Sequence, residues 1–291
     1  MIKIKDCEIK ENVSLKDFCT FKIGGNAKFL FVCNSTLALI DACKFCITKN
    51  IKFKVIGFGA NLLFDDMGFD GAIIVNRSCK IVTRKNALYI DSGTPISTVI
   101  NKCFMRELAG IDCLAGIPAT VGGGVVNSLG SGDTNLYDYV EWVEAYELPA
   151  LKKKRILNID CQFGYRTSIF KSINFLITKV KLVLPQGNRA NIRVNIINAI
   201  DKKIKNQPLD MPSAGSVFKR STIIPAKVID ELSFKGKSCG DAMVSKKHAG
   251  FIVNNANATS KDVKTLISSI KSSIYSRFKV VIEEEIEFVD F

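Results

Sequence analysis

The sequence predicts an α+β protein, and three observations support that fold class. Hydrophobic residues make up 47% and charged residues 24% of the 291 residues, a composition that is typical of globular proteins and excludes disorder, fibres and coiled coils. Segments with alternating β-branched residues and segments with helical periodicity follow one another in unequal blocks, unlike the regular order of a doubly wound sheet. The length allows about two or three compact domains.

The N-terminal half is predicted to contain both helices and strands. Apolar residues on one broad face predict a helix over 36–49, with the preceding serine as its N-cap. Residues 53–56 form a short apolar strand that ends on glycine, and the β-branched alternation of 71–91 predicts further strands. A helix over 96–107 leads into a glycine-rich loop over 110–132.

The C-terminal half alternates strands and helices around a pair of prolines. Pro208 and Pro212 stop any helix and mark the start of the last part of the chain. The elements expected here are strands within 139–184 around a basic turn, helices over 189–205, 224–232 and 260–276, a loop over 213–219 and a final strand over 279–289.

The net charge of +13 is high enough to attract phosphates, nucleic acid or an anionic surface. The basic residues are nevertheless scattered, and they cluster only at 151–155 and 202–205. Neither cluster has the interleaved aromatic residues of a single-strand binder, so most of this charge is expected to be solvated surface. We therefore expect no nucleic-acid partner.

The ten cysteines are expected to be reduced and mostly buried, because the chain is long and shows no export signal. Cys43 and Cys46 form the one C-x-x-C pair and His248 is the single histidine, which is too few ligands for a zinc site, so no metal is expected. Charges interrupt every apolar run before it could span a bilayer. We expect a cytoplasmic protein without membrane insertion.

Two glycine-rich loops are the strongest candidates for a ligand site. The first, at 57–61, does not open a helix as a dinucleotide fingerprint of the doubly wound kind requires, and taken alone it favours a plain turn between strands. The second, at 116–124, has three adjacent glycines inside an apolar stretch, which suits a close approach of the backbone to a ligand. Together the two loops point to a nucleotide cofactor whose pyrophosphate lies between them.

Six motifs in order give the chain a resemblance to a known family. They are CTFKIGG at 19–25, GFGANLL at 57–63, GIPATVGG at 116–123, FGYRTS at 163–168, PSAGSVFK at 212–219 and GDAMVSKKHAGFIVN at 240–254. The chain resembles the UDP-N-acetylenolpyruvoylglucosamine reductases (MurB) nearly from end to end, in their compact class without an extra substrate loop.

The resemblance implies an FAD-binding fold of the vanillyl-alcohol-oxidase class. Its two FAD-binding subdomains would occupy 1–72, which the C-terminal tail could join, and 73–188, and a substrate-binding α+β domain would occupy 189–291. FAD and NADPH are the implied cofactors, and the implied substrate is a sugar nucleotide of peptidoglycan precursor synthesis. We expect a monomer.

The resemblance also assigns a catalytic set of Ser216, Arg166 and Glu285. Ser216 matches the proton donor of the family and Arg166 the residue that binds the enolpyruvyl carboxylate, whereas without the motifs a turn serine and a surface arginine would be the commoner interpretations. Glu285 lies in a run of glutamates whose period-two alternation places it on one face with other acids, which together with burial under a ligand would raise its pKa. A solvated acidic strand face is the alternative.

The binding residues come from the same motif positions. Those implied for the cofactor are Gly57, Gly59, Ala60, Asn61, Gly116, Ile117, Pro118, Gly122 and Gly123. Those implied for the substrate are Tyr165, Lys219, Arg220 and Asn254. His248 is expected to be a packing or hydrogen-bonding residue.

The chain departs from the family pattern at Ala60 and Ala119, where the family usually has hydroxyl residues or glycine, and at 127–130. These departures leave two alternatives open. One is an FAD oxidoreductase of the same fold that acts on another substrate, and the other is a basic nucleotide- or RNA-binding relative without catalysis.

Overall fold

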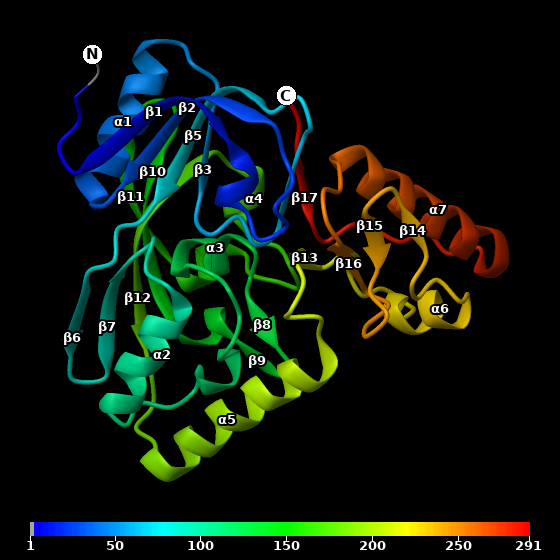
Figure 1. Cartoon of the computed structure of the whole chain (residues 1–291). Helices are drawn as coiled ribbons and strands as arrows, with labels where there is room; N and C mark the ends of the chain where they lie inside the picture. The colour runs from blue at the N-terminus through cyan, green and yellow to red at the C-terminus, as the bar shows by residue number, and fades with distance from the viewer. Residues whose placement is uncertain (1–2) are drawn as a thin grey trace. The chain divides into compact units, whose positions relative to one another are not determined.

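The computed structural model describes residues 3–291, and these divide into two compact units (Figure 1). The first unit comprises 3–10, 30–57 and 72–202, and the second comprises 11–29, 58–71 and 203–291. Each unit combines sheets with helices. The finer division into three domains, with boundaries at residues 72 and 188, stays a prediction.

The first unit is centred on a five-stranded sheet. Its strands, in spatial order, are β11 (Lys152–Leu157), β10 (Val140–Glu147), β12 (Phe175–Val183), β7 (Ala87–Asp91) and β6 (Ile81–Arg84). All four pairings are antiparallel, and the strands alternate side chains between the two faces. Side chains of this sheet form part of a hydrophobic core. Leu88 of β7, Val143 of β10 and Val180 of β12 belong to it, and each has no exposed surface.

The predicted basic turn at 151–155 is wrong, because most of it forms the edge strand β11. Its lysines are paired across the sheet with acids: Lys153 Nζ lies 2.9 Å from Glu144 Oε2, and Lys154 Nζ lies 2.6 Å from Glu147 Oε2. Lysines on an edge strand also prevent pairing with another chain. The basic cluster therefore belongs to the sheet, and two of its lysines form ion pairs with acids of β10.

The predicted loop over 110–132 is also corrected, since its three adjacent glycines, Gly122, Gly123 and Gly124, lie in the helix α3 (Val121–Val126). Thr120 caps this helix by accepting a hydrogen bond from the Gly123 N–H at 3.2 Å. Glycine is a poor helix former, but tertiary contacts override that preference here. A Cβ on Gly122 would lie 3.0 Å from Ser92, and one on Gly124 would lie 2.9 Å from Leu136.

The other helices of the first half agree with the sequence. Helix α1 (Thr36–Thr48) begins at Ser35, whose hydroxyl accepts a hydrogen bond from Ala38 N–H at 3.2 Å, and α2 covers Ile96–Met105. A second sheet has the order β1 (Cys7–Ser14), β2 (Asn26–Cys33), β5 (Phe69–Asn76) and β3 (Phe53–Ile56). The short elements are η1 (Leu15–Phe18), η2 (Asp112–Leu114), β8 (Gly130–Ser131), β9 (Thr134–Asn135), η3 (Leu136–Tyr139), η4 (Asn158–Cys161) and α4 (Ile169–Ser172).

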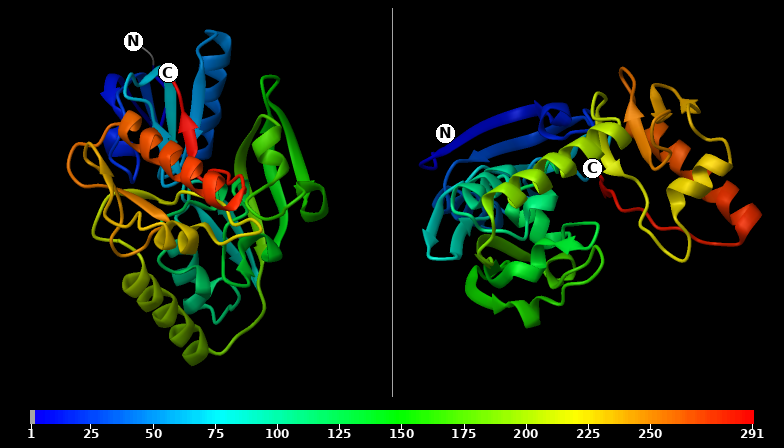
Figure 2. Two further views of the ribbon diagram at one scale, coloured as in Figure 1. Left: turned by 90° about the vertical axis from the view of Figure 1, so that its right-hand side faces the viewer. Right: turned by 90° about the horizontal axis from the view of Figure 1, so that it is seen from below.

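The C-terminal part of the second unit packs helices on a small antiparallel sheet. Helix α5 (Arg189–Asn206) leads into it along the chain, and its strands have the order β13 (Ser213–Ser216), β16 (Phe251–Asn254), β15 (Ala242–Val244) and β14 (Ser238–Cys239). Helix α7 (Ser260–Phe278) packs against β14 and β15, and α6 (Pro225–Glu231) lies beside α7 (Figures 1 and 2).

The predicted final strand over 279–289 is only partly correct. Regular pairing is limited to β17 (Glu287–Val289), which runs parallel to β4 (Leu62–Phe64), and Glu284 adds an isolated bridge to Phe218. The predicted alternation nevertheless holds over the irregular stretch, because Ile282 and Ile286 are buried. No helix within residues 3–291 has the length and apolar character needed to cross a membrane.

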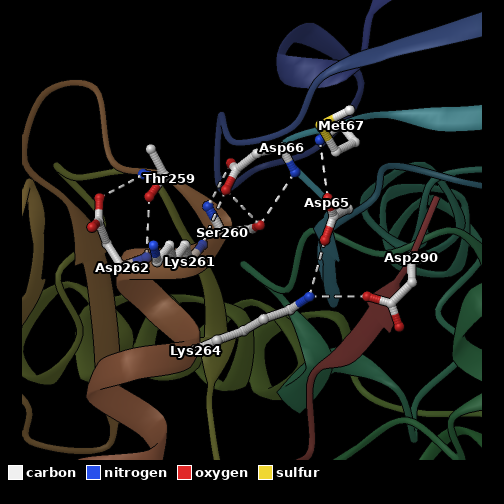
Figure 3. A network of polar contacts seen from close by, with 9 residues as sticks. All are labelled: Asp65, Asp66, Met67, Thr259, Ser260, Lys261, Asp262, Lys264 and Asp290. Carbon is white, nitrogen blue, oxygen red and sulfur yellow. Dashed lines mark hydrogen bonds and ion pairs between the residues drawn. The ribbon is translucent and has the colours of Figure 1, made fainter.

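A polar network joins the start of α7 to the segment after β4 (Figure 3). The Asp66 carboxylate accepts hydrogen bonds from the N–H of Ser260 at 2.7 Å and from that of Lys261 at 3.1 Å, so it satisfies two amides of the helix N-terminus. Lys264 Nζ lies 3.1 Å from Asp65 Oδ2 and 2.9 Å from Asp290 Oδ1. Lys264 therefore links the ends of β4 and β17 to helix α7.

Replacing Lys264 with methionine is expected to lower the free energy of unfolding by about 1 kcal/mol or less, because both ion pairs are partly solvated. The hydrogen bond from the Met67 N–H, with a further contribution from Lys264, lowers the pKa of Asp65. Burial opposes a raised pKa of Lys264, but the contacts with Asp290 and Asp65 outweigh it and raise that pKa. The contribution of ionised Asp65 to the free energy of unfolding is complete above about pH 4 and is lost as pH falls through its lowered pKa. The contribution of charged Lys264 is complete below about pH 10 and is lost as pH rises through its raised pKa.

The free energies of unfolding of wild type and K264M in urea, measured below about pH 4, between about pH 4 and pH 10, and above about pH 10, test the prediction. K261M is the matched control, because Lys261 joins the network through its backbone N–H. An equal loss of stability in both variants, or a K264M effect that persists at pH 2, would contradict the assigned ion pairs.

Candidate active site

The two glycine-rich loops meet in the first unit. Gly57 follows β3, and a Cβ at this position would lie 2.5 Å from Thr120 Oγ1. Thr120 is the N-cap of α3, so the start of the first loop packs directly on the helix that the second loop leads into. The sequence predicted that these loops act together, and the structure brings Gly57 and Thr120 into contact.

The second loop is held by the main chain of residues 92–96. Val121 N–H donates to the Thr94 carbonyl at 2.9 Å and Gly122 N–H to the Ser92 carbonyl at 2.7 Å. Gly116, before Ile117 and Pro118, has a φ of +80°, which disfavours any other residue. Gly57 and Gly122 are thus required by packing of the protein itself, whereas a Cβ on Gly123 would meet only Thr120 Oγ1, at 3.3 Å, and leaves room for a ligand.

The loops fit a dinucleotide with a pyrophosphate. No acidic side chain occurs in 57–61 or 116–124, so nothing in either loop would repel an anion. The positive φ of Gly116 allows close approach of the backbone, whereas the N–H groups of Val121, Gly122 and Gly123 at the start of α3 already donate hydrogen bonds within the protein. Ala60 adds apolar surface where a hydroxyl group would have added a hydrogen bond, and the Cβ of the half-buried Ala119 restricts φ.

The rest of the first loop belongs to the second unit and is tied to the C-terminal segment. Gly59 has a φ of +62° and packs against the Phe18 carbonyl. Asn61 Nδ2 donates to the carbonyl of Glu285 at 2.9 Å, and the Glu287 N–H donates to the carbonyl of Asn61 at 2.8 Å. Asn61 was predicted only as a cofactor residue, and its role in holding Glu285 was not found from the sequence.

Ser216 and Glu285 are brought together on neighbouring segments of the second unit. Ser216 ends β13 opposite Phe251 of β16, and the next residue, Val217, accepts a hydrogen bond from Glu285 N–H at 2.7 Å. Gly215 has a φ of +80°, and a Cβ there would have no heavy atom within 4 Å, so the backbone beside Ser216 faces open space. Both Ser216 and Glu285 are half-buried.

The glutamates beside Glu285 are each paired with a lysine. Lys219 Nζ lies 2.9 Å from Glu283 Oε2, and this contact lowers the pKa of Glu283. Lys271 Nζ lies 2.9 Å from Glu284 Oε1. These lysines offset the like-charge repulsion that was expected to raise the Glu285 pKa, so the raised pKa stays a prediction that depends on burial under a ligand.

Arg166 lies at the tip of a tight loop in the first unit. Its φ is +55°, and the loop is closed by a bridge between Gly164 and Thr167. The loop is fixed to the end of α3, because Ser168 Oγ donates to the Val126 carbonyl at 2.8 Å and Ser128 Oγ donates to the Thr167 carbonyl. Ser128, in the segment that departs from the family pattern, thereby has a structural role that the sequence did not indicate.

The remaining substrate candidates differ in accessibility. Tyr165 has 54% of its surface exposed, with its ring centroid 5.7 Å from Arg166 Cζ, and Arg220 is exposed. Asn254 is only 4% exposed; its amide donates to the Phe21 carbonyl at 3.2 Å and accepts from the Ala258 N–H at 2.9 Å. Asn254 therefore organises the backbone of the second unit in this structure.

Neither His248 nor the cysteines form a metal centre. His248 Nδ1 accepts a hydrogen bond from Gly250 N–H at 3.1 Å and the ring packs on Phe251, while burial lowers its pKa. This agrees with the expected packing role. All ten cysteines are free thiols, and the described part of the chain contains no group of three or more residues that could hold a metal ion.

Comparisons with known proteins give consistent matches. Residues 27–148 match the model of the FAD binding domain, and residues 207–289 match that of the UDP-N-acetylenolpyruvoylglucosamine reductase C-terminal domain. The chain is 35% identical to the UDP-N-acetylenolpyruvoylglucosamine reductase of Caldicellulosiruptor saccharolyticus, over 97% of this chain and 92% of that protein. It is 34% identical to the enzyme of the same name from Pseudothermotoga lettingae, over 97% and 98%.

A solved structure is also similar over nearly the whole chain. The crystal structure of UDP-N-acetylenolpyruvylglucosamine reductase (MurB) from Thermus caldophilus matches with a TM-score of 0.82 and 29% identity, covering 97% of this chain and 98% of that one. Together with the two family models, this match confirms the predicted fold class, an FAD-binding part followed by a C-terminal α+β domain.

Proposed function

The chain belongs to the UDP-N-acetylenolpyruvoylglucosamine reductase family, and from this premise we propose that it reduces the enolpyruvyl group of UDP-N-acetylglucosamine enolpyruvate, with NADPH as reductant and FAD as cofactor. The observation that carries the proposal is the backbone hydrogen bond of 2.7 Å between Glu285 and Val217, which places Glu285 beside Ser216 within a chain that matches the family over 97% of its length. The product, UDP-N-acetylmuramate, is a precursor of peptidoglycan.

The residues that would hold FAD come from both glycine-rich loops. The open space beside Gly123 and the positive φ of Gly116 suit a close approach to the pyrophosphate, and the close packing of Gly57 on Thr120 fixes the two loops to each other. When bound, FAD supplies the hydride chemistry that no side chain can provide. The contribution of this chain is to bind, to orient and to move a proton.

Proton delivery is assigned to Ser216. Addition of hydride to the enolpyruvyl methylene carbon leaves negative charge on the carbon beside the carboxylate, and this strong base can take a proton from a well-placed weak acid such as the Ser216 hydroxyl. Arg166 would bind the carboxylate with its planar, permanently charged guanidinium and oppose the charge that develops there. Glu285, protonated, would donate a hydrogen bond to the same enolate, with Asn61 holding its backbone at 2.9 Å.

Replacing Arg166 with lysine is expected to raise the KM for the enolpyruvyl substrate by about 10- to 100-fold, because a compact ammonium group cannot form the two-point contact with a carboxylate. Flavin reduction by NADPH should be unchanged. Steady-state and single-turnover kinetics check both statements. R155K is the matched control, since Arg155 of β11 packs over Trp142 of β10, with its Cζ 4.5 Å from the ring centroid. An equal rise in KM in R155K would contradict the assignment.

The proposed reaction is tested by an anaerobic visible spectrum of the purified protein. Addition of NADPH should bleach the flavin band, and addition of UDP-N-acetylglucosamine enolpyruvate should restore it. If NADPH bleaches the flavin band but the enolpyruvyl substrate does not restore it, the result would favour an FAD oxidoreductase with another substrate. A protein that stays colourless with added FAD would contradict the proposal and favour a binding role without catalysis.

The cellular setting is part of the same proposal. The substrate is a charged sugar nucleotide, and a monomeric protein in the cytoplasm would meet it there without membrane insertion or a nucleic-acid partner. Loss of the activity would then impair cell-wall biogenesis, and with it cell shape and division.

A further inference from the structure

Cys7 and Cys33 lie opposite each other in the first unit, with their Sγ atoms 3.7 Å apart. Cys7 begins β1 and Cys33 ends β2, and these strands are neighbours in one sheet. The Asn34 N–H donates to the Asp6 carbonyl at 2.9 Å, so the strands run antiparallel there and this hydrogen bond flanks Cys7 and Cys33.

This register suits a disulfide bond. Hydrogen-bonded and non-hydrogen-bonded pairs alternate along an antiparallel ladder, which makes Cys7 and Cys33 a non-hydrogen-bonded pair. The Cα atoms of such a pair are about 4.5 Å apart, within the range of about 4.4–6.8 Å that disulfides span. A bond between the two sulfur atoms therefore needs no change of strand pairing.

The two thiols have complementary properties. Cys7 is partly exposed, whereas Cys33 has no exposed surface. The contact between the two sulfur atoms lowers the pKa of Cys7, against smaller opposing effects of burial and of Glu8, and the same contact and burial raise the pKa of Cys33. Cys7 is thus the accessible thiol with the greater thiolate character, and Cys33 is a protected thiol within reach of it.

The C-x-x-C pair does not have these properties. Cys43 and Cys46 lie on one buried face of α1, and burial raises the pKa of both, that of Cys46 to about 11. Cys79 is exposed, and within the described residues no second cysteine sulfur is in hydrogen-bonding contact with it. The two thiols that lie close together, Cys7 and Cys33, are therefore brought together by strand register and not by sequence spacing.

We propose that Cys7 and Cys33 form a reversible oxidation site that reacts with hydroperoxides. The Cys7 thiolate attacks the peroxide O–O bond, which gives the Cys7 sulfenic acid and, after protonation, releases one water or alcohol. The Cys33 thiol then attacks the sulfenic sulfur, the S–S bond forms and water leaves. In total two thiols lose two electrons and two protons, and one peroxide is reduced.

Peptide mapping of the folded full-length protein tests the proposal. The reduced protein is treated with stoichiometric hydrogen peroxide, alkylated, and digested with trypsin without reductant. The expected product is a disulfide between peptides 6–10 and 29–44, with the number of free thiols falling by two from ten. The midpoint of thermal unfolding should rise by several degrees on oxidation and return with dithiothreitol, because the bond closes the segment between the two cysteines.

Matched variants identify the partner, because peptide 29–44 contains both Cys33 and Cys43. C43S and C79S should keep the crosslink, whereas C7S and C33A should lose it together with the shift in unfolding midpoint. A crosslink that survives in C33A, that forms only in urea, or that is replaced by sulfinic acid at Cys7 would overturn the proposal.

Discussion

Replacing Ser216 with alanine is expected to lower kcat with the enolpyruvyl substrate by about 10²- to 10⁴-fold, the usual contribution of a general acid. The hydroxyl is absent but the strand is retained, since Ser216 pairs with Phe251 through its backbone. Flavin content and the rate of flavin reduction by NADPH should therefore stay at the wild-type level. Stopped-flow measurement of the two half-reactions separates these effects.

S213A is the matched control for this experiment. Ser213 lies on the same strand, opposite Val253, and its carbonyl accepts a hydrogen bond from Thr20 Oγ1 at 2.7 Å, a contact that alanine keeps. S213A should retain turnover close to the wild-type rate. Unchanged turnover in S216A, or an equal loss in both variants, would rule out Ser216 as the proton donor.

The second large effect is expected at Gly57. An alanine Cβ there would lie 2.5 Å from Thr120 Oγ1 and 2.8 Å from Thr120 Cγ2, closer than real Cβ contacts, so Thr120 must move. Overpacking of this kind costs about 1–3 kcal/mol. Because Thr120 also caps α3, we expect G57A to lose both thermal stability and most of its affinity for FAD.

A double-mutant cycle tests this cause directly. T120A alone should lose about 1 kcal/mol through its missing helix cap, but in G57A/T120A the two closest contacts of the new Cβ are removed. The double variant should therefore be more stable than the sum of the single effects predicts. Strict additivity in urea unfolding and in flavin titration would show that the effect of G57A does not arise from Thr120.

The elements that local periodicity determines were predicted well. Helices α1 and α7 match the predicted ranges within two residues, since each has its own apolar face and its own cap. The helix at Val121–Val126 was predicted as a loop, because its glycines are helical only through contacts with Ser92 and Leu136, which are distant in the sequence. The strand character of the basic stretch 151–155 depended in the same way on partners across the sheet.

Only the candidate residues that lie in sequence motifs could be predicted from the sequence. The resemblance predicts Ser216 and Glu285 as catalytic residues, but the hydrogen bond that places Glu285 next to Val217 joins segments 68 residues apart, and no local pattern encodes it. Ser128 and the pair Cys7 and Cys33 were missed for the same reason. Each depends on register between separate elements, which a single sequence does not reveal.

The contacts of Asn61 constrain one side of this junction more than the other. The side chain and the main chain of Asn61 both hold the segment 285–287, but the two groups that they contact there, the Glu285 carbonyl and the Glu287 N–H, belong to the main chain. Changes of side chain at 285 and 287 therefore keep both hydrogen bonds, whereas loss of the amide at residue 61 leaves the Glu285 carbonyl without this donor. A relative that lacks an amide at residue 61 should hold the segment that carries Glu285 less firmly, whatever side chains that segment has.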